Sequence, residues 1–373
     1  MPKFTHTLEI EYKPSFRSRA IEGMFDVPAA KLLTKSWDVD MPIEDMKWEI
    51  GMIVGPSGSG KTTIAKHAFP DAVFFDGLKH ENWNSPCFVD DFQKGISIKD
   101  ITTALSQVGF SSPPSWLLPF SALSNGQKFR AEIARLMRET PEGETLMVDE
   151  FTSVVDRQVA QFCSSAVQKM IRRSNRKMVA VSCHDDIINW LLPDWIYYVD
   201  TGEFKVTRGL LRRPEIKLTI QRVHHSAWRL FKGHHYLDAN INPSAHCYVG
   251  FIDEIPVGFC AVLHQPHAIA KGIKKGHRTV VLPDYQGVGI GNALSETIAQ
   301  HYIDNGFRFR SVTSHPAMIK HRCNSPLWVR TRAGSLVSPQ GKSGIMHKTS
   351  ADRWTSSFEY IGKKNVEAES KTN

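Results

Sequence analysis

A glycine-rich segment near residue 55 has the residue types and spacing that bind phosphate groups. Gly55-Pro56-Ser57-Gly58-Ser59-Gly60-Lys61-Thr62 matches G-x-x-x-x-G-K-[ST], directly after the apolar run Ile50–Val54 and before a helical stretch. Glycines let backbone N–H groups curl around phosphates, lysine neutralises the phosphate charge, and a threonine hydroxyl can coordinate Mg²⁺. We therefore expect a nucleotide site, with Thr62 as a magnesium ligand, whose binding residues are Gly55, Ser57, Gly58, Gly60, Lys61, Thr62 and Thr63.

Two further apolar runs also end in residues that can act on a nucleotide. Leu146–Val148 precedes Asp149 and Glu150, and Met178–Ser182 precedes Cys183 and His184. Buried parallel strands deliver such residues to the carboxyl edge of a sheet. Asp149 is then expected to hold Mg²⁺ and Glu150 to polarise the attacking water. The alternatives are that the two acids are merely solvated and that His184 is a packed or surface histidine.

The segment Leu123-Ser124-Asn125-Gly126-Gln127 begins a predicted helix. Ser124 and Gln127 form a Ser-x-x-Gln capping box, and apolar residues then recur at helical spacing. Taken alone, the segment could be an ordinary capped amphipathic helix. Between the two nucleotide-type elements, however, it resembles the LSGGQ signature of ABC ATPases, with Asn125 in place of the usual first glycine.

This resemblance implies a set of roles and a working state. Lys61, Glu150 and His184 become catalytic candidates, with His184 as the switch histidine that contacts the γ-phosphate of ATP. Ser124, Gly126 and Gln127 become nucleotide contacts, and Ser153–Asp156 takes the position of the D-loop. In this family the signature of one protomer completes the ATP site of the other. One such motif of each kind per chain therefore implies an ATP-dependent homodimer.

The chain departs from the ABC pattern in two places. Gln93 is the better Q-loop candidate and Gln107 the poorer one, and that role stays open. The interval from Lys61 to Ser124 is shorter than in transporter ATPases, which suggests that the subdomain that docks on membrane subunits is trimmed and argues against transport.

The second half carries a different glycine pattern. A predicted hairpin spans His246–Leu263 and turns at 253–256. After a histidine-rich basic loop, a strand is predicted at Arg278–Leu282. The segment Pro283–Gly291 then begins a helix that extends to about Asn305. Strand, glycine turn and helix make a pyrophosphate-binding arrangement. The strand Phe307–Thr313 follows. Gln286-x-x-Gly289-x-Gly291 resembles the Q/R-x-x-G-x-G/A motif of GNAT acyltransferases, which implies acetyl-CoA or another acyl-CoA bound by Gln286, Gly287, Gly289 and Gly291. The alternative is a tight turn at a helix start.

The base for such a transfer is not settled by the sequence. Candidates are His315 and Tyr236, which we favour, together with His234, His235, His264 and His267, although each histidine could be structural. The whole chain resembles ABC-ATPase–acetyltransferase fusions of prokaryotes and their phages, and its second domain has some likeness to Mom-type phage enzymes that modify DNA bases.

Composition and charge frame these expectations. The chain has 373 residues and net charge +8; residues 1–204 hold 22 Lys+Arg against 27 Asp+Glu, while residues 205–373 hold 24 against 11, or +13. The basic half suggests a nucleic-acid partner, or else a solvated basic surface. No apolar run is long enough for a membrane span, and six cysteines without close pairing suggest a cytoplasmic protein without disulfides or zinc.

The expected architecture is α/β: a P-loop NTPase domain of ABC type over residues 1–210, then a GNAT-like α+β domain over 211–373 that ends in a disordered tail. The rivals are a nucleic-acid-associated ABC ATPase whose second domain is not catalytic, and the ATPase subunit of a transporter. The acyl group, the acceptor and the purpose of ATP hydrolysis are not specified by the sequence.

Overall fold

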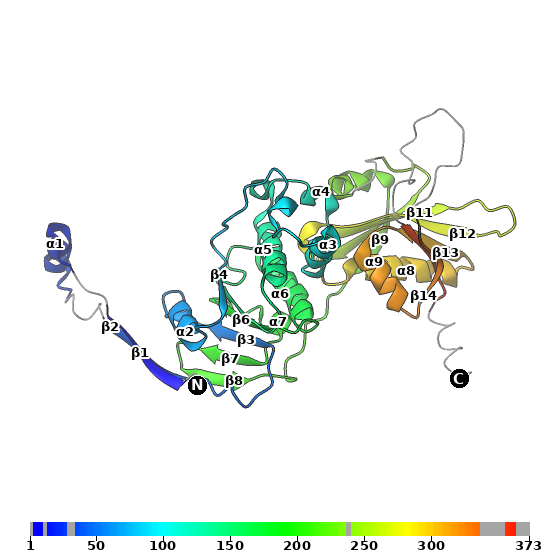
Figure 1. Ribbon diagram of the computed structural model, residues 1–373. Coiled ribbons are helices and arrows are strands. Elements are labelled where there is room, and N and C mark those ends of the chain that lie inside the picture. The colour runs from blue at the N-terminus through cyan, green and yellow to red at the C-terminus, as the bar shows by residue number, and fades with distance from the viewer. Residues whose placement is uncertain (1–2, 10–12, 28–33, 236–239, 336–354, 363–373) are drawn as a thin grey trace. The chain divides into compact units, whose positions relative to one another are not determined.

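The computed structural model describes residues 3–9, 13–27, 34–235, 240–335 and 355–362 (Figure 1). The chain divides into two compact units. Unit 1 comprises Met1–His80, Thr140–Val154 and Gln168–Arg213, and unit 2 comprises Glu81–Glu139, Val155–Val167 and Pro214–Asn373. Helix α6 (Arg157–Ile171) contributes to both units. The domain boundary near residue 210 stays a prediction.

Unit 1 is built on a six-stranded sheet with the order β4-β5-β6-β3-β7-β8, in which only β8 runs antiparallel to its neighbour. Its central strands are buried, as the apolar runs predict. The elements of unit 1 are β1 (Lys3–Glu9), α1 (Phe16–Phe25), β2 (Thr34–Asp40), β3 (Ile50–Val54), α2 (Lys61–Ala68), β4 (Val73–Asp76), β5 (Thr145–Asp149), β6 (Lys177–Ser182), α7 (Ile188–Leu191), β7 (Trp195–Tyr198) and β8 (Glu203–Val206). The three predicted strands are thus confirmed as β3, β5 and β6.

Strands β1 and β2 form a separate antiparallel ribbon that the sequence analysis did not predict. Trp37 and Val39 alternate with exposed residues along β2 and are buried in one core cluster with Ile53 and Ile64. Because successive side chains of a strand point to opposite faces, one face of β2 closes the core beside the glycine-rich loop.

Unit 2 begins with a small helical layer. Helices α3 and α5 pack against each other, and stacked aromatic pairs such as Phe88 with Phe110 fill the space beside them. Its elements are η2 (Phe88–Asp91), α3 (Ile98–Gln107), α4 (Pro113–Trp116), η3 (Phe120–Ala122) and α5 (Asn125–Glu139).

The rest of unit 2 is a seven-stranded sheet of order β14-β15-β13-β12-β11-β10-β9. One face packs on α8 and α9, and the 3₁₀ helix η4 and the adjoining Phe231 supply residues to the core on the other face. Its elements are β9 (Thr219–Val223), η4 (His225–Leu230), η5 (Lys232–His234), β10 (His246–Ile252), β11 (Ile255–His264), β12 (Ile273–Val281), η6 (Pro283–Tyr285), α8 (Ile290–Asp304), β13 (Arg308–Thr313), α9 (Pro316–Asn324), β14 (Trp328–Ser335) and β15 (Thr355–Tyr360).

The predicted hairpin is confirmed as β10 and β11, but its turn is tighter than expected. Asp253 and Glu254 alone connect the strands, and both have positive φ, 46° and 68°. This matches the backbone of a two-residue type I′ turn, whose twist suits the strands it joins. Strand β12 begins five residues earlier than predicted, at Ile273, because the basic segment before Arg278 pairs with both β11 and β13.

Within the described part of the chain, no helix combines the length and the apolar character needed to cross a bilayer.

Candidate nucleotide and acyl-CoA sites

The glycine-rich loop connects β3 to α2, as the sequence predicts. Gly60 is the N-cap of α2 with φ 103°, and a Cβ at this position would lie 2.3 Å from the Trp37 ring. A side chain at residue 60 would therefore meet both backbone strain and a steric clash. Gly55 and Ser57 lie in the loop ahead of it, and Thr63 lies in the first turn of α2.

The ribbon strand β2 holds this loop in place. Trp37 Nε1 donates a hydrogen bond to Ser59 O at 2.7 Å, and Lys35 Nζ donates to Gly58 O at 2.8 Å. Both acceptors are loop carbonyls, so these bonds turn carbonyl oxygens toward β2 and leave the loop amides other than Ser59 N–H, which donates to Pro56 O at 3.2 Å, as candidate anion ligands.

Lys61, Thr62 and Asp149 come together at the start of α2. The Thr62 hydroxyl donates to Asp149 Oδ2 at 2.7 Å, and Lys61 Nζ donates to Pro56 O at 2.8 Å. Lys61 and Asp149 are only 6% and 5% exposed. Burial raises the pKa of Asp149, and the charges of Glu150 and Asp76 raise it further, while the Thr62 hydrogen bond lowers it. A hydroxyl beside a buried carboxylate that other acids surround fits the oxygen ligands Mg²⁺ prefers.

Glu150 lies directly beyond this pair, in the left-handed region at φ 48°. Its backbone N–H donates to Asp149 Oδ1 at 3.0 Å, and Ser153 Oγ donates to Glu150 Oε2 at 2.6 Å. A non-glycine residue in this conformation costs free energy that the surroundings must offset. The carboxylate is thereby held in a single direction at the sheet edge.

His184 follows β6, the strand between β5 and β3 in the sheet. Its ring is half-buried and its backbone N–H donates to Ser182 Oγ at 3.1 Å. Because parallel strands end at the same edge, the topology brings the loop after β3, Glu150 and His184 to one edge of the unit 1 sheet. Gln93 and Gln107 both lie in unit 2, and the Q-loop role stays open.

The capping box at the start of α5 is confirmed. Ser124 N–H donates to Gln127 Oε1 at 3.0 Å, and Gln127 N–H donates back to Ser124 Oγ at 3.3 Å. Ser124 and Asn125 are exposed, whereas Gly126 and Gln127 are buried. A Cβ on Gly126 would lie 2.9 Å from Val159, so α6 packs closely against the start of α5.

The second glycine segment leads from η6 into α8. Gly287 and Gly289 both have positive φ, 90° and 99°, and Gly289 caps α8, whose first turn contains Gly291. A Cβ on Gly289 would meet no atom within 4 Å. The first N–H groups of a helix lack partners one turn earlier in the helix and suit an anion such as a pyrophosphate, although Asn292 N–H here donates to Gly289 O at 3.1 Å.

Gln286 is used differently from the expectation that it contacts the cofactor. Its Nε2 donates to Val281 O at 2.8 Å, and its Oε1 accepts from Ser111 N–H at 2.7 Å. Both ends of the amide are therefore engaged within the protein, one with β12 and one with the helical layer. This arrangement fixes the loop from the side, while the backbone amides remain the candidate ligands.

The same loop is packed against the helical layer at several points. Arg130 of α5 is 1% exposed and donates to Pro283 O at 2.6 Å and to Asp284 O at 3.3 Å. A Cβ on Gly287 would lie 2.9 Å from Gly109 Cα. Helix α5, which begins with the predicted signature, thus bonds directly to the segment that leads into α8.

Strands β12 and β13 form a fork. They pair in parallel only from Ile273 with Arg308 to Gly276 with Ser311, although each strand continues beyond that point. His277 is the next residue of β12, at an irregularity in its pairing with β11. Burial lowers the pKa of His277 to about 4, and the charges of Arg278 and Lys275 lower it further. The sequence analysis missed His277 because it placed this residue in a loop.

The predicted base candidates are scattered. His315 is the N-cap residue of α9 after the end of β13, and its Nε2 lies 3.4 Å from Ser111 O. Burial lowers the pKa of His315, while the hydrogen bond with the Ser111 carbonyl raises it. His264 and His267 are exposed, whereas His234 lies in η5 and His235 is buried beside Trp228. Tyr236 lies outside the described residues.

A comparison with protein families found a match in the C-terminal half. Residues 210–319 match the acetyltransferase (GNAT) family. The resemblance drawn from Gln286–Gly291 is thereby confirmed. The match also agrees with the expected GNAT-like α+β domain, and the mostly parallel sheet of unit 1 with its glycine-rich loop agrees with the expected P-loop α/β domain, whose ABC type stays a prediction.

Solved structures similar to the chain fall into the same two groups. One is an ATP-binding cassette solved as a dimer in a post-hydrolysis state with ADP and phosphate, which is 17% identical over 47% of this chain and 91% of its own, with a TM-score of 0.35. Another is cbiO1 of Clostridium perfringens, 16% identical over 47% and 80%, with a TM-score of 0.33. A third is the ribosomal-protein-S18-alanine N-acetyltransferase of Escherichia coli, 15% identical over 39% and 96%, with a TM-score of 0.30. No curated protein sequence matches the chain significantly.

Proposed function

We propose that the chain is an ATPase that uses the P-loop site of unit 1 and is joined to an acyl-CoA-dependent N-acyltransferase in unit 2. The observation that carries the ATPase activity is the 2.7 Å hydrogen bond from Thr62 to the buried Asp149, next to Lys61 at the start of α2. Thr62 and Asp149 would hold Mg²⁺, which supplies charge neutralisation on the phosphates.

The protein's own residues would divide the hydrolytic work among them. Lys61 Nζ donates a hydrogen bond to Pro56 O. When ATP binds, it would donate to oxygens of the β and γ phosphates instead. The Glu150 carboxylate, oriented by Ser153, is aimed to accept a hydrogen bond from the attacking water. His184, at the end of the neighbouring strand, would contact the γ-phosphate.

Lys61→Ala should abolish ATP hydrolysis and weaken ATP binding strongly, because the phosphates lose the cation at the start of α2. The measurement is steady-state phosphate release together with titration of a fluorescent ATP analogue. Lys66→Ala is the matched control, since this exposed lysine lies on the same helix. Hydrolysis at the wild-type rate in Lys61→Ala would remove the P-loop assignment.

The acyltransferase activity is supported by the GNAT family match, the positive-φ glycines before α8 and the fork between β12 and β13. In the proposed reaction the acceptor nitrogen bonds to the thioester carbonyl carbon and the carbon–sulfur bond breaks. A base takes the proton from the nitrogen, and the thiolate leaves with CoA. Backbone amides at the start of α8 would hold the pyrophosphate.

Gly289→Glu should abolish acetyl-CoA binding by the full chain, because a negative charge at the N-cap of α8 would repel the pyrophosphate. Gly289→Ala is the control, since it adds the same backbone strain without the charge and should weaken binding much less. Isothermal titration of acetyl-CoA measures both variants. Equal binding by wild type and Gly289→Glu would contradict the site, and a wild type that binds no acetyl-CoA would favour a non-catalytic second domain.

Two finer features belong to this proposal. An ATP-dependent homodimer is supported by the single P-loop and the single capped signature helix, whose exposed Ser124 and Asn125 are available to a second copy. A nucleic-acid acceptor is supported by the charge of +13 on residues 205–373, since CoA needs only a few cationic partners.

A further inference from the structure

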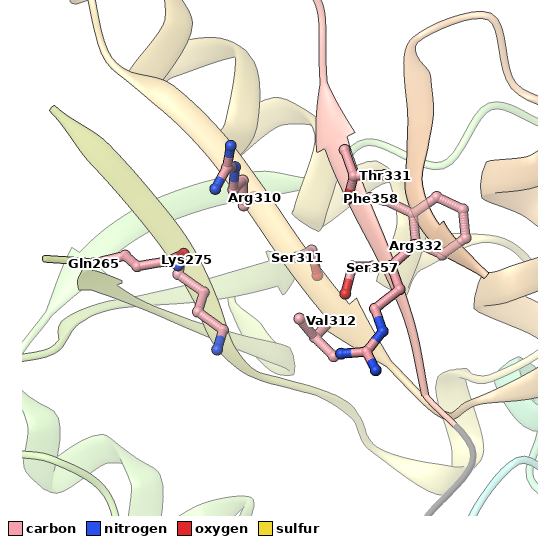
Figure 2. A pocket seen from close by; sticks show the side chains of 9 residues that line it. All are labelled: Gln265, Lys275, Arg310, Ser311, Val312, Thr331, Arg332, Ser357 and Phe358. Atoms are coloured by element: carbon pink, nitrogen blue, oxygen red, sulfur yellow. The ribbon is translucent and has the colours of Figure 1, made fainter. Parts of the chain in front are cut away.

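A small basic pocket lies on the sheet of unit 2 beside the strand fork (Figure 2). Its volume is about 230 Å³, and its lining includes Lys275 of β12, Arg310 and Val312 of β13, Arg332 of β14 and Ser357 of β15. Four neighbouring strands thus contribute to one hollow. No residue of the glycine segment before α8 is among its lining residues.

The pocket opens on the face of the sheet that α8 does not cover. Phe309 and Phe358 pack in the core with α8, and they alternate along their strands with Arg310, Val312 and Ser357, although Phe358 also borders the pocket. Because neighbouring side chains of a strand point to opposite faces, the latter three face away from α8. Val312 is 42% exposed, so the pocket is accessible from solvent.

The charges in the pocket are only partly balanced. Glu359 accepts hydrogen bonds from Arg310 Nε at 3.1 Å and from Arg308 Nε at 2.6 Å, so this single acid serves two arginines. In the described residues neither Lys275 nor Arg332 forms an ion pair. Figure 2 shows these two side chains extending to the same side, with Val312 between them. The pocket therefore offers two available cations and a hydroxyl to an anion.

Its size sets what it can enclose. Pockets for whole small molecules usually span about 300–1,000 Å³, and this one is smaller. It suits a single charged group whose parent molecule continues into solvent. A guanidinium, an ammonium and a hydroxyl together match the tetrahedral acceptor oxygens of a phosphate.

Position separates this pocket from the expected pyrophosphate site. Lys275 precedes Val281, the last residue of β12, by six residues, or roughly 20 Å along a strand. The glycine segment lies beyond Val281, and α8 covers the opposite face. The pocket instead adjoins Gly276 and Ser311, the last paired residues before the fork. An anion bound here would lie at the fork, on the face opposite α8, and would be a different group from a pyrophosphate held at the start of α8.

We propose that Lys275, Arg332 and Ser357 bind a backbone phosphate of a nucleic-acid acceptor and so position its amine at the fork between β12 and β13. This proposal rests on the proposed acyltransferase function. The proposal assigns part of the positive charge of residues 205–373 to one phosphate subsite. Arg310, which shares Glu359 with Arg308, supports the pocket wall.

The test is binding of fluorescein-labelled single-stranded DNA, duplex DNA and RNA to the full chain between about 50 and 200 mM salt. For the single strand, Lys275→Gln and Arg332→Gln should each reduce the slope of log affinity against log salt by about 0.7, and the double variant by about 1.4. Lys320→Gln, an exposed lysine on α9, is the matched control and should leave the slope near its wild-type value. A double variant with the wild-type slope for all three nucleic acids overturns the proposal.

Two further measurements distinguish loss of the phosphate subsite from misfolding of the variants and from failure of the proposed acyltransferase function. Each variant should bind acetyl-CoA with wild-type affinity, which shows that unit 2 is folded and tests the transferase proposal separately. In the unmodified protein, the oligonucleotide should protect Lys275 from acylation by an amine-reactive reagent, read by mass spectrometry, while Lys320 stays reactive. Unprotected Lys275, or equal protection by poly-glutamate, overturns the assignment of a phosphate.

Discussion

At the scale of single residues, local hydrogen bonds assign the roles more sharply than the motifs do. Gln286 matches a cofactor-binding motif, yet both ends of its side-chain amide are engaged by Val281 and Ser111. His277 belongs to no motif, yet it directly follows the last paired residue of the fork. A residue that matches a motif can therefore support a loop, while a residue without a motif can lie directly at the fork.

His277→Gln should lower kcat for acyl transfer by about 10²–10⁴ with little change in KM for acetyl-CoA, because it removes a proton acceptor at the fork. Since the pKa of His277 is about 4, its ring is neutral at pH 7 and the wild-type rate should fall only as the pH drops toward that value. His315→Gln is the matched comparison, with the ring whose Nε2 lies near Ser111 O. A large loss in His315→Gln alone would identify His315 as the base.

At the scale of elements, the sequence predicts most accurately where the pattern is local. The strand Ile50–Val54 and the Ser124–Gln127 capping box are both confirmed, because burial and hydrogen bonding there depend on neighbouring residues. The ribbon of β1 and β2 was not predicted, because Trp37 is placed by a distant contact with the P-loop. The fork and the pocket were missed because both depend on pairing between strands that are far apart in sequence.

Helix α5 also carries a buried acid that makes its stability depend on pH. Burial raises the pKa of Glu132 to about 7 from 4.5, opposed by the hydrogen bond from Trp83 and the charge of Arg135. The folded state therefore binds the Glu132 proton more tightly than the unfolded state does. The contribution of this proton to the free energy of unfolding is fully present below pH 4.5 and is lost as the pH rises through 7.

Glu132→Gln should remove this dependence, because the amide oxygen can still accept from Trp83 Nε1 while carrying no charge. Between pH 4.5 and 7.5 the wild type should lose about 3 kcal/mol of unfolding free energy relative to the variant. Urea unfolding at several pH values, followed by tryptophan fluorescence, measures the difference. Parallel pH profiles for the two proteins would show that Glu132 is ionised at its ordinary pKa.

At the scale of the whole molecule, α5 connects the predicted signature with the loop before α8. Its first residues form the capping box of that predicted signature, and Arg130, one and a half turns further on, donates to the carbonyls of Pro283 and Asp284. The helical layer also contacts the loop through Gly109 and Gly287, where neither residue has room for a side chain. A rearrangement of α5 on ATP binding would therefore be felt at the acyl-CoA site.

This linkage is testable with Glu150→Gln, which should bind ATP without hydrolysing it, because the amide fills the same space but does not polarise water. ATP should convert this variant to a dimer in size-exclusion chromatography, and the dimer's affinity for acetyl-CoA should differ from that of the ATP-free protein by about fivefold or more. Thermodynamic reciprocity requires acetyl-CoA to change the affinity for ATP by the same factor.

The double variant Lys61→Ala/Glu150→Gln, which should not bind ATP strongly, is the control for ATP added to the acetyl-CoA titration. A variant that stays monomeric with ATP contradicts the signature-mediated dimer, whereas a dimer with unchanged acetyl-CoA affinity contradicts transmission through α5 and leaves the two sites independent.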